Sequence, residues 1–272
     1  MHQTDIQQWD YEVEADLLSD AGCCRQANQD LISYLKPADH AVLKEKGVLA
    51  IVADGMGGHQ GGQLASQLAV DAIQKRYYAR PREHPPRSLK KAFAEANSFV
   101  YQRSLESHAL HGMGTTASAL VVKDRQIYFA HVGDSRIYRQ RDGELARLTE
   151  DHTVVMEMVH RGLLTPEQAR MHPDRYIITR ALGTHPEVEI FAPKAALAVH
   201  SGDCYVLCTD GLHDLVTDDE IEAIVASRSP HEACTELTTL AKRRGGPDNI
   251  SVGVLAVRAV GKTSRPAHDT RT

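Results

Sequence analysis

The chain has 272 residues, and its 36 acidic against 31 basic side chains give a formal net charge of −5. Hydrophobic residues make up 42% and charged residues 25%, which is ordinary usage for a globular protein. No stretch approaches the ~20 uninterrupted apolar residues of a membrane span, and residues 1–10 lack the apolar core of a secretory signal. We therefore expect a cytoplasmic protein without membrane insertion. A mildly acidic chain with no dense basic run also argues against nucleic-acid binding.

The predicted elements alternate between short apolar runs and longer amphipathic ones. In chain order they are a buried strand over 48–53, a helix over 62–78, a proline-rich break at 80–87, a helix over 88–108, an antiparallel meander of strands at 115–122, 126–132 and 136–140, a polar helical stretch at 151–183, a strand over 204–209, two helices that begin with capping boxes at Thr217 and Ser229, and a last strand over 250–257. This order predicts an α+β layered fold. The absence of a G-x-G-x-x-G string after the first strand disfavours a doubly wound nucleotide-binding fold.

The five cysteines do not suggest a secreted scaffold. Cys23 and Cys24 are adjacent and cannot supply a C-x-x-C zinc knuckle. Cys204 and Cys208 lie in an apolar run that is typical of a strand, and Cys234 falls on a helical pattern. We predict reduced thiols with structural roles.

Aspartates recur where the predicted strands begin and end. Asp54 and Asp210 each precede a glycine after a strand, Asp134 lies between two strands, Asp248 precedes the last strand, and Asp30 closes a polar run. Taken singly, Asp-Gly after a strand is an ordinary hairpin-turn signal. If the fold brings these carboxylates together, their repulsion requires cations. Oxygen ligands suit magnesium or manganese, and two such ions ~4 Å apart activate a water molecule and bind an anionic oxygen.

Eight sequence strings in a fixed order cover residues 10–257. They are RQANQD (25–30), VADGMGGHQGGQLAS (52–66), GMGTTASALVV (112–122), HVGDSRIY (131–138), LTEDHT (148–153), ITRALGT (178–184), VLCTDGL (206–212) and GGPDNISV (245–252). On these strings the chain resembles bacterial members of the metal-dependent protein phosphatase family, the serine/threonine phosphatases of type 2C. The resemblance implies a four-layer αββα sandwich of two antiparallel sheets flanked by helices. It implies a phosphatase domain over 10–258, with a helical flap at about 153–183 that contacts substrate, and flexible termini at 1–9 and 259–272.

The resemblance also implies a metal site with manganese or magnesium. Its residue matches assign two core ions to Asp54, the backbone carbonyl of Gly55, Asp210 and Asp248, a network of metal-bound water to Asp30, and a third, weaker ion to Asp134. The implied catalytic residues are Arg25, Asp54, Asp210 and Asp248.

Five further positions bear on this match. Arg25 matches the arginine that binds the substrate phosphate, a role that suits a planar bidentate donor, and Asn249 matches a residue that helps to fix the site. Gln29 departs from the glutamate usual in bacterial members, which removes a charge beside the metal site. Met56 stands where many eukaryotic relatives carry a histidine, so the general acid is open, and His59 is a nearby candidate with an equally good surface role.

The activity implied by the resemblance is hydrolysis of phosphoserine and phosphothreonine in proteins by a metal-activated water. We expect a monomer that acts on phosphorylated proteins and opposes a serine/threonine kinase in bacterial signalling. One alternative is a catalytically weak phosphoprotein-binding regulator of the same fold, which Gln29 supports. Another is a serine hydrolase with Ser135 as the nucleophile, although residues 133–135 lack a glycine-rich elbow.

Overall fold

The computed structural model describes residues 11–57 and 61–259. The expected flexible termini, 1–9 and 259–272, lie outside the described residues except for Ala259, which ends the last strand. The candidate acid His59 also lies outside them. No helix in the described ranges is long and apolar enough to cross a membrane.

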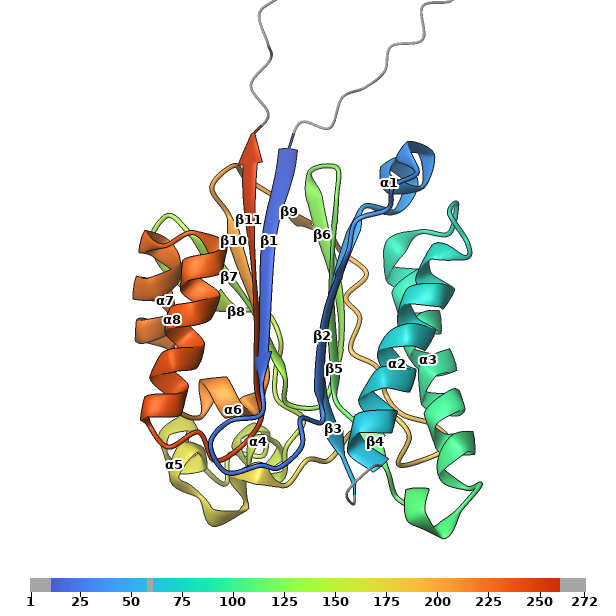
Figure 1. Ribbon diagram of the computed structural model, residues 1–272, viewed down its shortest axis with the longest axis vertical. Coiled ribbons are helices and arrows are strands. Elements are labelled where there is room, and N and C mark those ends of the chain that lie inside the picture. Colours follow the sequence, from blue (N-terminus) through green and yellow to red (C-terminus); the bar gives the residue numbers. More distant parts are fainter. Residues whose placement is uncertain (1–10, 58–60, 260–272) are drawn as a thin grey trace, which may run out of the picture.

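Two antiparallel sheets pack face to face at the centre of the molecule (Figure 1). The first has the order β1 (Tyr11–Asp20), β11 (Ile250–Ala259), β10 (Cys204–Cys208), β7 (Arg136–Arg141) and β8 (Glu144–Arg147). The second has the order β2 (Asp30–Leu35), β3 (Val48–Met56), β5 (Ala117–Lys123), β6 (Gln126–Val132) and β9 (Leu197–Ala198), and β4 (Gly114–Thr115) pairs with the end of β3.

Helices cover the outer face of each sheet. In Figure 1, α2 (Gly61–Tyr78) and α3 (Pro85–Ser104) lie on the second sheet, whereas α7 (Asp218–Ser227) and α8 (Pro230–Arg243) lie on the first. The predicted four-layer αββα sandwich is confirmed. Shorter elements complete it: α1 (His40–Lys46), α4 (Val154–His160), α5 (Pro166–Met171), α6 (Asp210–His213), and 3₁₀ turns at His108–Leu110 and Pro173–Tyr176.

The apolar run of β3 is continuous because both faces of this strand are covered. Leu49, Ile51 and Ala53 pack toward α2 and α3, whereas Val48, Ala50 and Val52 pack between the two sheets. A strand that is buried on both sides needs no alternation of polar and apolar residues. A third apolar cluster lies between the first sheet and the helices α7 and α8.

Several predicted boundaries are wrong. The prediction missed β1 and β2, whose side chains are in part exposed, and α1, which is short. Both properties weaken the apolar signal in the sequence. The second helix runs over Pro85–Ser104 rather than 88–108, because proline at its first position favours initiation there. The stretch 151–183 contains two short helices and a 3₁₀ turn in place of one long helical region. The capping boxes at Thr217 and Ser229 are confirmed, and Thr165 forms another at the start of α5.

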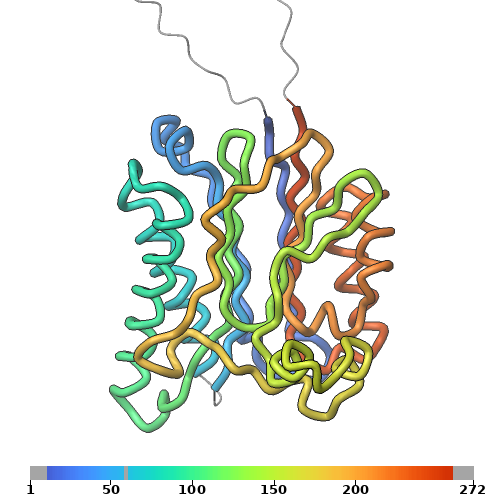
Figure 2. The backbone as a smooth tube through the Cα atoms, turned by 180° about the vertical axis from the view of Figure 1, so that it is seen from behind, coloured from blue at the N-terminus to red at the C-terminus, as the bar shows by residue number. Residues whose placement is uncertain are grey.

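The flap packs at one end of the sandwich, and the start of β1 and the end of β11 lie at the other (Figures 1 and 2). Its end is joined to the second sheet where Leu182 pairs with Thr115. The chain then follows the edge of β6, where Phe191 pairs with His131, before it reaches β9 (Figure 2). The same end carries the 21–29 loop, which connects β1 of one sheet to β2 of the other. Loops from both sheets are therefore placed beside the flap.

Candidate metal centre

Strand pairing and sheet crossings gather the predicted aspartates at the flap end of the sandwich. Asp30 opens β2 and lies directly opposite Asp54 of β3 in the antiparallel register. Asp134 lies in the turn where the chain passes from β6 in one sheet to β7 in the other. Asp210 begins α6 after β10, and Asp248 lies in the loop before β11. Both sheets thus contribute carboxylates.

The backbone of Asp54 is fixed by two threonines. The Asp54 amide donates to Thr116 Oγ1 at 2.9 Å, and the Asp54 carbonyl accepts from Thr115 Oγ1 at 2.8 Å and from the Thr116 amide at 2.9 Å. Thr116 Oγ1 in turn lies 2.6 Å from Ser135 Oγ, next to Asp134. A chain of buried hydroxyl groups therefore links the two segments that carry Asp54 and Asp134.

Thr209 connects Asp30 to the opposite sheet. Its hydroxyl donates to Asp30 Oδ2 at 2.9 Å, while its own oxygen accepts from the Ser251 amide at 3.0 Å. The Thr209 amide donates to the Ser251 carbonyl at 3.1 Å. Since Thr209 directly precedes Asp210, these bonds hold Asp30 and Asp210 in one buried unit.

Both Asp-Gly pairs are sites of close backbone approach rather than hairpin turns. A Cβ on Gly55 would lie 2.1 Å from the Gly62 carbonyl oxygen, and one on Gly211 would lie 1.9 Å from that of Asn249. Gly55 continues β3 and pairs with Thr115, and Gly211 lies within α6. The hairpin interpretation is wrong at both positions because the chain continues as a strand at Gly55 and as a helix at Gly211, and the close backbone packing explains why each residue is glycine.

Burial and mutual repulsion raise the pKa values of four of the carboxyl groups. Burial is the largest cause for Asp54, whose pKa lies well above its usual range, and the charges of Asp30 and Asp210 raise it further. The pKa of Asp30 rises to about 7, chiefly through burial. Burial likewise raises the pKa values of Asp134 and Asp210. Ionising all four groups is therefore unfavourable without a cation.

The donor set fits divalent cations that prefer oxygen. Asp30, Asp134 and Asp210 each have a buried Oδ1 atom without a hydrogen-bond partner, a costly arrangement that a cation would relieve. In the described ranges, however, no three His, Cys, Asp or Glu side chains are arranged to hold an ion as they stand. The centre is recognised from unpartnered oxygens and mutual repulsion, not from completed ligand geometry.

Arg25 lies at the edge of this centre. Its Nη2 atom contacts Asp248 Oδ2 at 2.6 Å, and this pairing is the main cause of the raised pKa of Arg25. The guanidinium remains about half exposed, with 54% of the side chain accessible. Arg25 is therefore both oriented by an aspartate of the centre and open to an anionic ligand.

Asn249 braces the loop that carries Arg25. Its Oδ1 atom accepts from the Gln29 amide at 2.8 Å, and its Nδ2 atom donates to the carbonyls of Ala21 and Ala27 at 3.1 and 2.9 Å. The Gln29 side chain donates to the Gly57 carbonyl at 3.3 Å, a bond that a carboxylate could not make. Gln29 therefore connects its loop to the end of β3.

Ser135 does not fit the serine hydrolase alternative. The residue has no exposed surface, and its hydroxyl is bonded to Thr116 inside the sheet crossing. A nucleophile must reach its substrate, so this serine has a structural role. Met56 is partly buried at the end of β3.

An ion pair at the base of the flap joins two residues of the recognised strings for which the sequence predicts no role. Arg136 contacts Asp151 at 2.6 Å, and the Asp151 pKa falls to about 2 because this guanidinium outweighs burial. Next to it, the rings of His131 and His152 are in contact, with centroids 4.7 Å apart and planes tilted by 38°. Spacing along the chain could not reveal this pairing, since residues 136 and 151 meet only through the β7–β8 hairpin.

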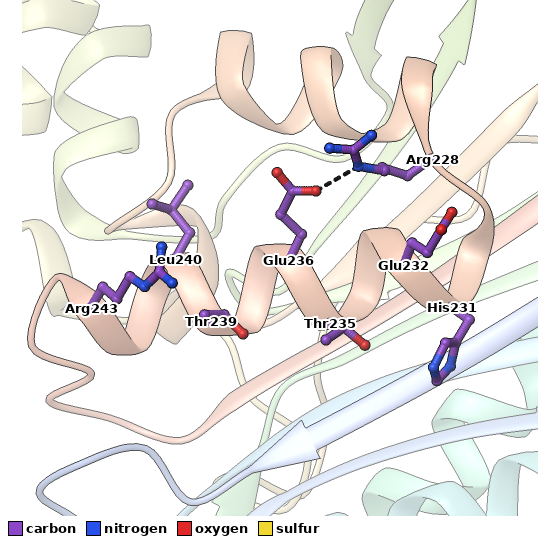
Figure 3. Close-up of a pocket in the computed structure, with 8 residues that line it drawn as sticks. All are labelled: Arg228, His231, Glu232, Thr235, Glu236, Thr239, Leu240 and Arg243. Atoms are coloured by element: carbon purple, nitrogen blue, oxygen red, sulfur yellow. Dashed lines mark hydrogen bonds and ion pairs between the residues drawn. The ribbon is translucent and has the colours of Figure 1, made fainter.

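The hollow drawn in Figure 3 is separate from the aspartates. It has a volume of about 620 Å³ and lies on the outer surface at α8. Its lining is mixed and largely charged: Arg228, His231, Glu232, Thr235, Glu236, Thr239, Leu240 and Arg243. The aspartates at the flap end are not part of it.

Comparison with known proteins identifies a family. The family model described as Protein phosphatase 2C matches residues 25–242. The serine/threonine protein phosphatase PstP of Mycobacterium tuberculosis is 38% identical over 239 residues, which are 88% of this chain and 44% of that protein. The protein phosphatase PhpP of Streptococcus pneumoniae is 35% identical over 250 residues, which are 90% of this chain and 98% of that protein.

A solved structure agrees with the fold. The catalytic domain of the serine/threonine protein phosphatase PstP in complex with two manganese ions has a TM-score of 0.77 at 34% identity, covering 91% of this chain and 99% of that one. The chain spans less than half the length of the M. tuberculosis PstP sequence, but nearly the whole of the PstP catalytic domain.

Proposed function

The chain belongs to the protein phosphatase 2C family, and from this we propose that it hydrolyses phosphoserine and phosphothreonine in proteins with manganese or magnesium. One observation carries the proposal: buried aspartates from both sheets meet with raised pKa values and unpartnered oxygens. Ionising these carboxyl groups is unfavourable in the metal-free protein and becomes favourable when cations bind between them. The two manganese ions of the PstP catalytic domain support the same choice of metal.

The residues proposed to hold two core ions are Asp54, the carbonyl of Gly55, Asp210 and Asp248, with Asp134 at a third ion. When bound, the ions supply an activated water and offset negative charge on the phosphoryl oxygens. The chain's contribution is to fix the segments that carry these carboxylates. Thr116 fixes the backbone of Asp54, and Thr209 fixes the side chain of Asp30, which is proposed to orient water at the site.

Arg25 is proposed to bind the phosphate of the substrate. A guanidinium has five N–H donors in a planar fork, and the bond to Asp248 leaves others for a phosphoryl group. The same bond points Arg25 toward the aspartates. Substrate would therefore be held between Arg25 and the proposed metal centre, with the flap beside it.

The proposed substrates are phosphorylated proteins, as the names of PstP and PhpP support. We further propose a cytoplasmic monomer that opposes a serine/threonine kinase.

Turnover of phosphothreonine and phosphoserine peptides with increasing manganese tests the proposal, with a phosphotyrosine peptide as a control. We expect metal-dependent release of phosphate that a chelator abolishes and a serine-directed reagent leaves unchanged. Asp54→Asn and Asp210→Asn should each remove nearly all turnover, while Asp71→Asn, on the exposed face of α2, should not. Substantial turnover by either site variant with manganese would refute the assignment. Peptide binding without turnover by the unmodified protein would favour the regulator alternative.

A further inference from the structure

His213 is a buried histidine beside the aspartates, and the recognised sequence strings do not include it. It directly follows the string 206–212 and ends α6, three residues after Asp210. Only 3% of its side chain is exposed. The turn that carries it is fixed, because Gly211 packs closely on neighbouring backbone and Leu212 is buried in the apolar cluster between the first sheet and its helices. The ring is therefore held at a defined place at this end of the sheet.

The order of the strands explains why His213 reaches the turn that carries Asp134. β10 and β7 are neighbours in the first sheet, and Cys208 at the end of β10 lies opposite Arg136 at the start of β7. α6 follows β10 and the Asp134 turn precedes β7, so antiparallel pairing brings both segments to the flap end of the sheet, where Figure 1 shows α6. One side chain on α6 can then join the two segments.

A single hydrogen bond makes this connection. His213 Nε2 lies 3.1 Å from the backbone carbonyl oxygen of Asp134. Because a carbonyl can only accept, the contact assigns the ring proton to Nε2. Nδ1 lies 3.3 Å from Asp214 Oδ1 but has no hydrogen-bond partner in the part of the chain that the structure describes. The ring is therefore anchored by hydrogen bonding through Nε2.

The position of the Asp134 carboxyl group depends on its backbone. The residue is buried, and within the described ranges its Oδ1 atom has no hydrogen-bond partner. The next residue, Ser135, is fixed by bonds of its hydroxyl and carbonyl to Thr116 and Ser118. The carbonyl of Asp134 itself accepts from His213. A change in this peptide group would therefore move a carboxyl group that its own contacts do not hold.

We propose that His213 is a positioning residue, which sets the place of the Asp134 carboxyl group by binding the carbonyl of the same residue. The proposal rests on the proposed role of Asp134 as the ligand of a third ion. Loss of the Nε2–H donor leaves the carbonyl without its partner, so the turn shifts and the carboxyl group moves with it. Affinity for the ion at Asp134 should fall at least about tenfold, as expected when a group that orients a ligand is removed. The other ions should be affected much less.

Calorimetric titration of the metal-free protein with manganese measures ion affinity without substrate. Asp134→Asn identifies the ion held by Asp134, since the affinity of that ion falls in this variant. Glutamine places an amide nitrogen near the position of Nε2, whereas the amide of asparagine reaches only as far as Nδ1. We expect His213→Asn to weaken this ion at least about tenfold and His213→Gln to stay close to the wild type. His231→Asn, at an exposed histidine on α8, should change nothing.

Two further readouts separate positioning of Asp134 from a general effect on α6. In an Asp134→Asn background, His213→Asn should cause little further loss of manganese affinity, because both changes act at the same residue. Turnover of a phosphothreonine peptide by His213→Asn should require more manganese for its half-maximal rate, while kcat at saturating manganese stays near that of the wild type. Circular dichroism should show the wild-type fold in both His213 variants.

Four results would each overturn the proposal. They are equal affinities in His213→Gln and His213→Asn, equal weakening of all ions in His213→Asn, an additive loss in the double variant, and a titration that Asp134→Asn leaves unchanged. If manganese binding shows the expected differences but phosphopeptides are not turned over, the proposed function fails and the role of His213 stands. If turnover depends on metal but the His213 variants bind manganese alike, the proposed function stands and the role of His213 fails.

Discussion

Replacing the buried carboxyl group of Asp30 should stabilise the metal-free protein above neutral pH. Burial is the main reason that its pKa rises from 3.8 to about 7, a difference of about 3 pKa units. Each unit corresponds to about 1.4 kcal/mol, so ionised Asp30 costs the folded state about 4 kcal/mol at pH 8. Asp30→Asn removes this cost and keeps an oxygen that accepts from Thr209.

The direction of the pH dependence follows from the raised pKa. The folded state holds its proton more tightly than the unfolded chain, so this contribution is complete below pH 3.8 and is lost as pH rises through about 7. From pH 5 to pH 8 the loss in the wild-type protein should be about 3 kcal/mol from Asp30 alone. Asp54, Asp134 and Asp210 have shifts of the same sign, so part of the slope should remain in the variant.

Urea unfolding in EDTA, followed by circular dichroism at pH 5 and pH 8, measures both effects. We expect Asp30→Asn to exceed the wild type in stability by about 4 kcal/mol at pH 8 and by only about 1–2 kcal/mol at pH 5. Asp71→Asn, on an exposed helix face, should follow the wild type at both pH values. The reasoning fails if Asp30→Asn is less stable than the wild type at pH 8. It also fails if the variant loses as much stability between pH 5 and pH 8 as the wild type does.

Three further substitutions test other parts of the structure. Thr209→Val should cost about 1–3 kcal/mol in urea unfolding, because it leaves the Ser251 amide without its partner, whereas Thr209→Ser should cost less. Burial lowers the pKa of His131 from 6.5 to about 4, so stability should fall by roughly 3 kcal/mol as pH drops through that range. His131→Gln should reduce this fall in chelator, and an unchanged pH profile would contradict the assignment. Gly211→Ala would place a Cβ 1.9 Å from the Asn249 carbonyl oxygen, so manganese-dependent turnover should be strongly reduced, and normal turnover would show that this contact relaxes freely.

Local patterns were sufficient for elements whose signals lie within a few residues. The capping boxes at Thr217 and Ser229 mark helix starts correctly, because each bond joins residues three apart. The run over 48–53 forms a strand because no polar residue interrupts it. β1 was missed although its first residues alternate between buried and exposed, since only pairing with β11 makes that short pattern decisive.

The sequence by itself determined the family, since eight ordered strings needed no coordinates to be recognised. Only the tertiary structure decided that Asp30 lies opposite Asp54 and that Cys23 is exposed while it packs beside Gly246. It also decided that the glycines of both Asp-Gly pairs pack closely on neighbouring backbone. The physical reason is that a carboxyl pKa depends on burial and on charges far away along the chain. The aspartates therefore act as one electrostatic group only after both sheets have brought them together.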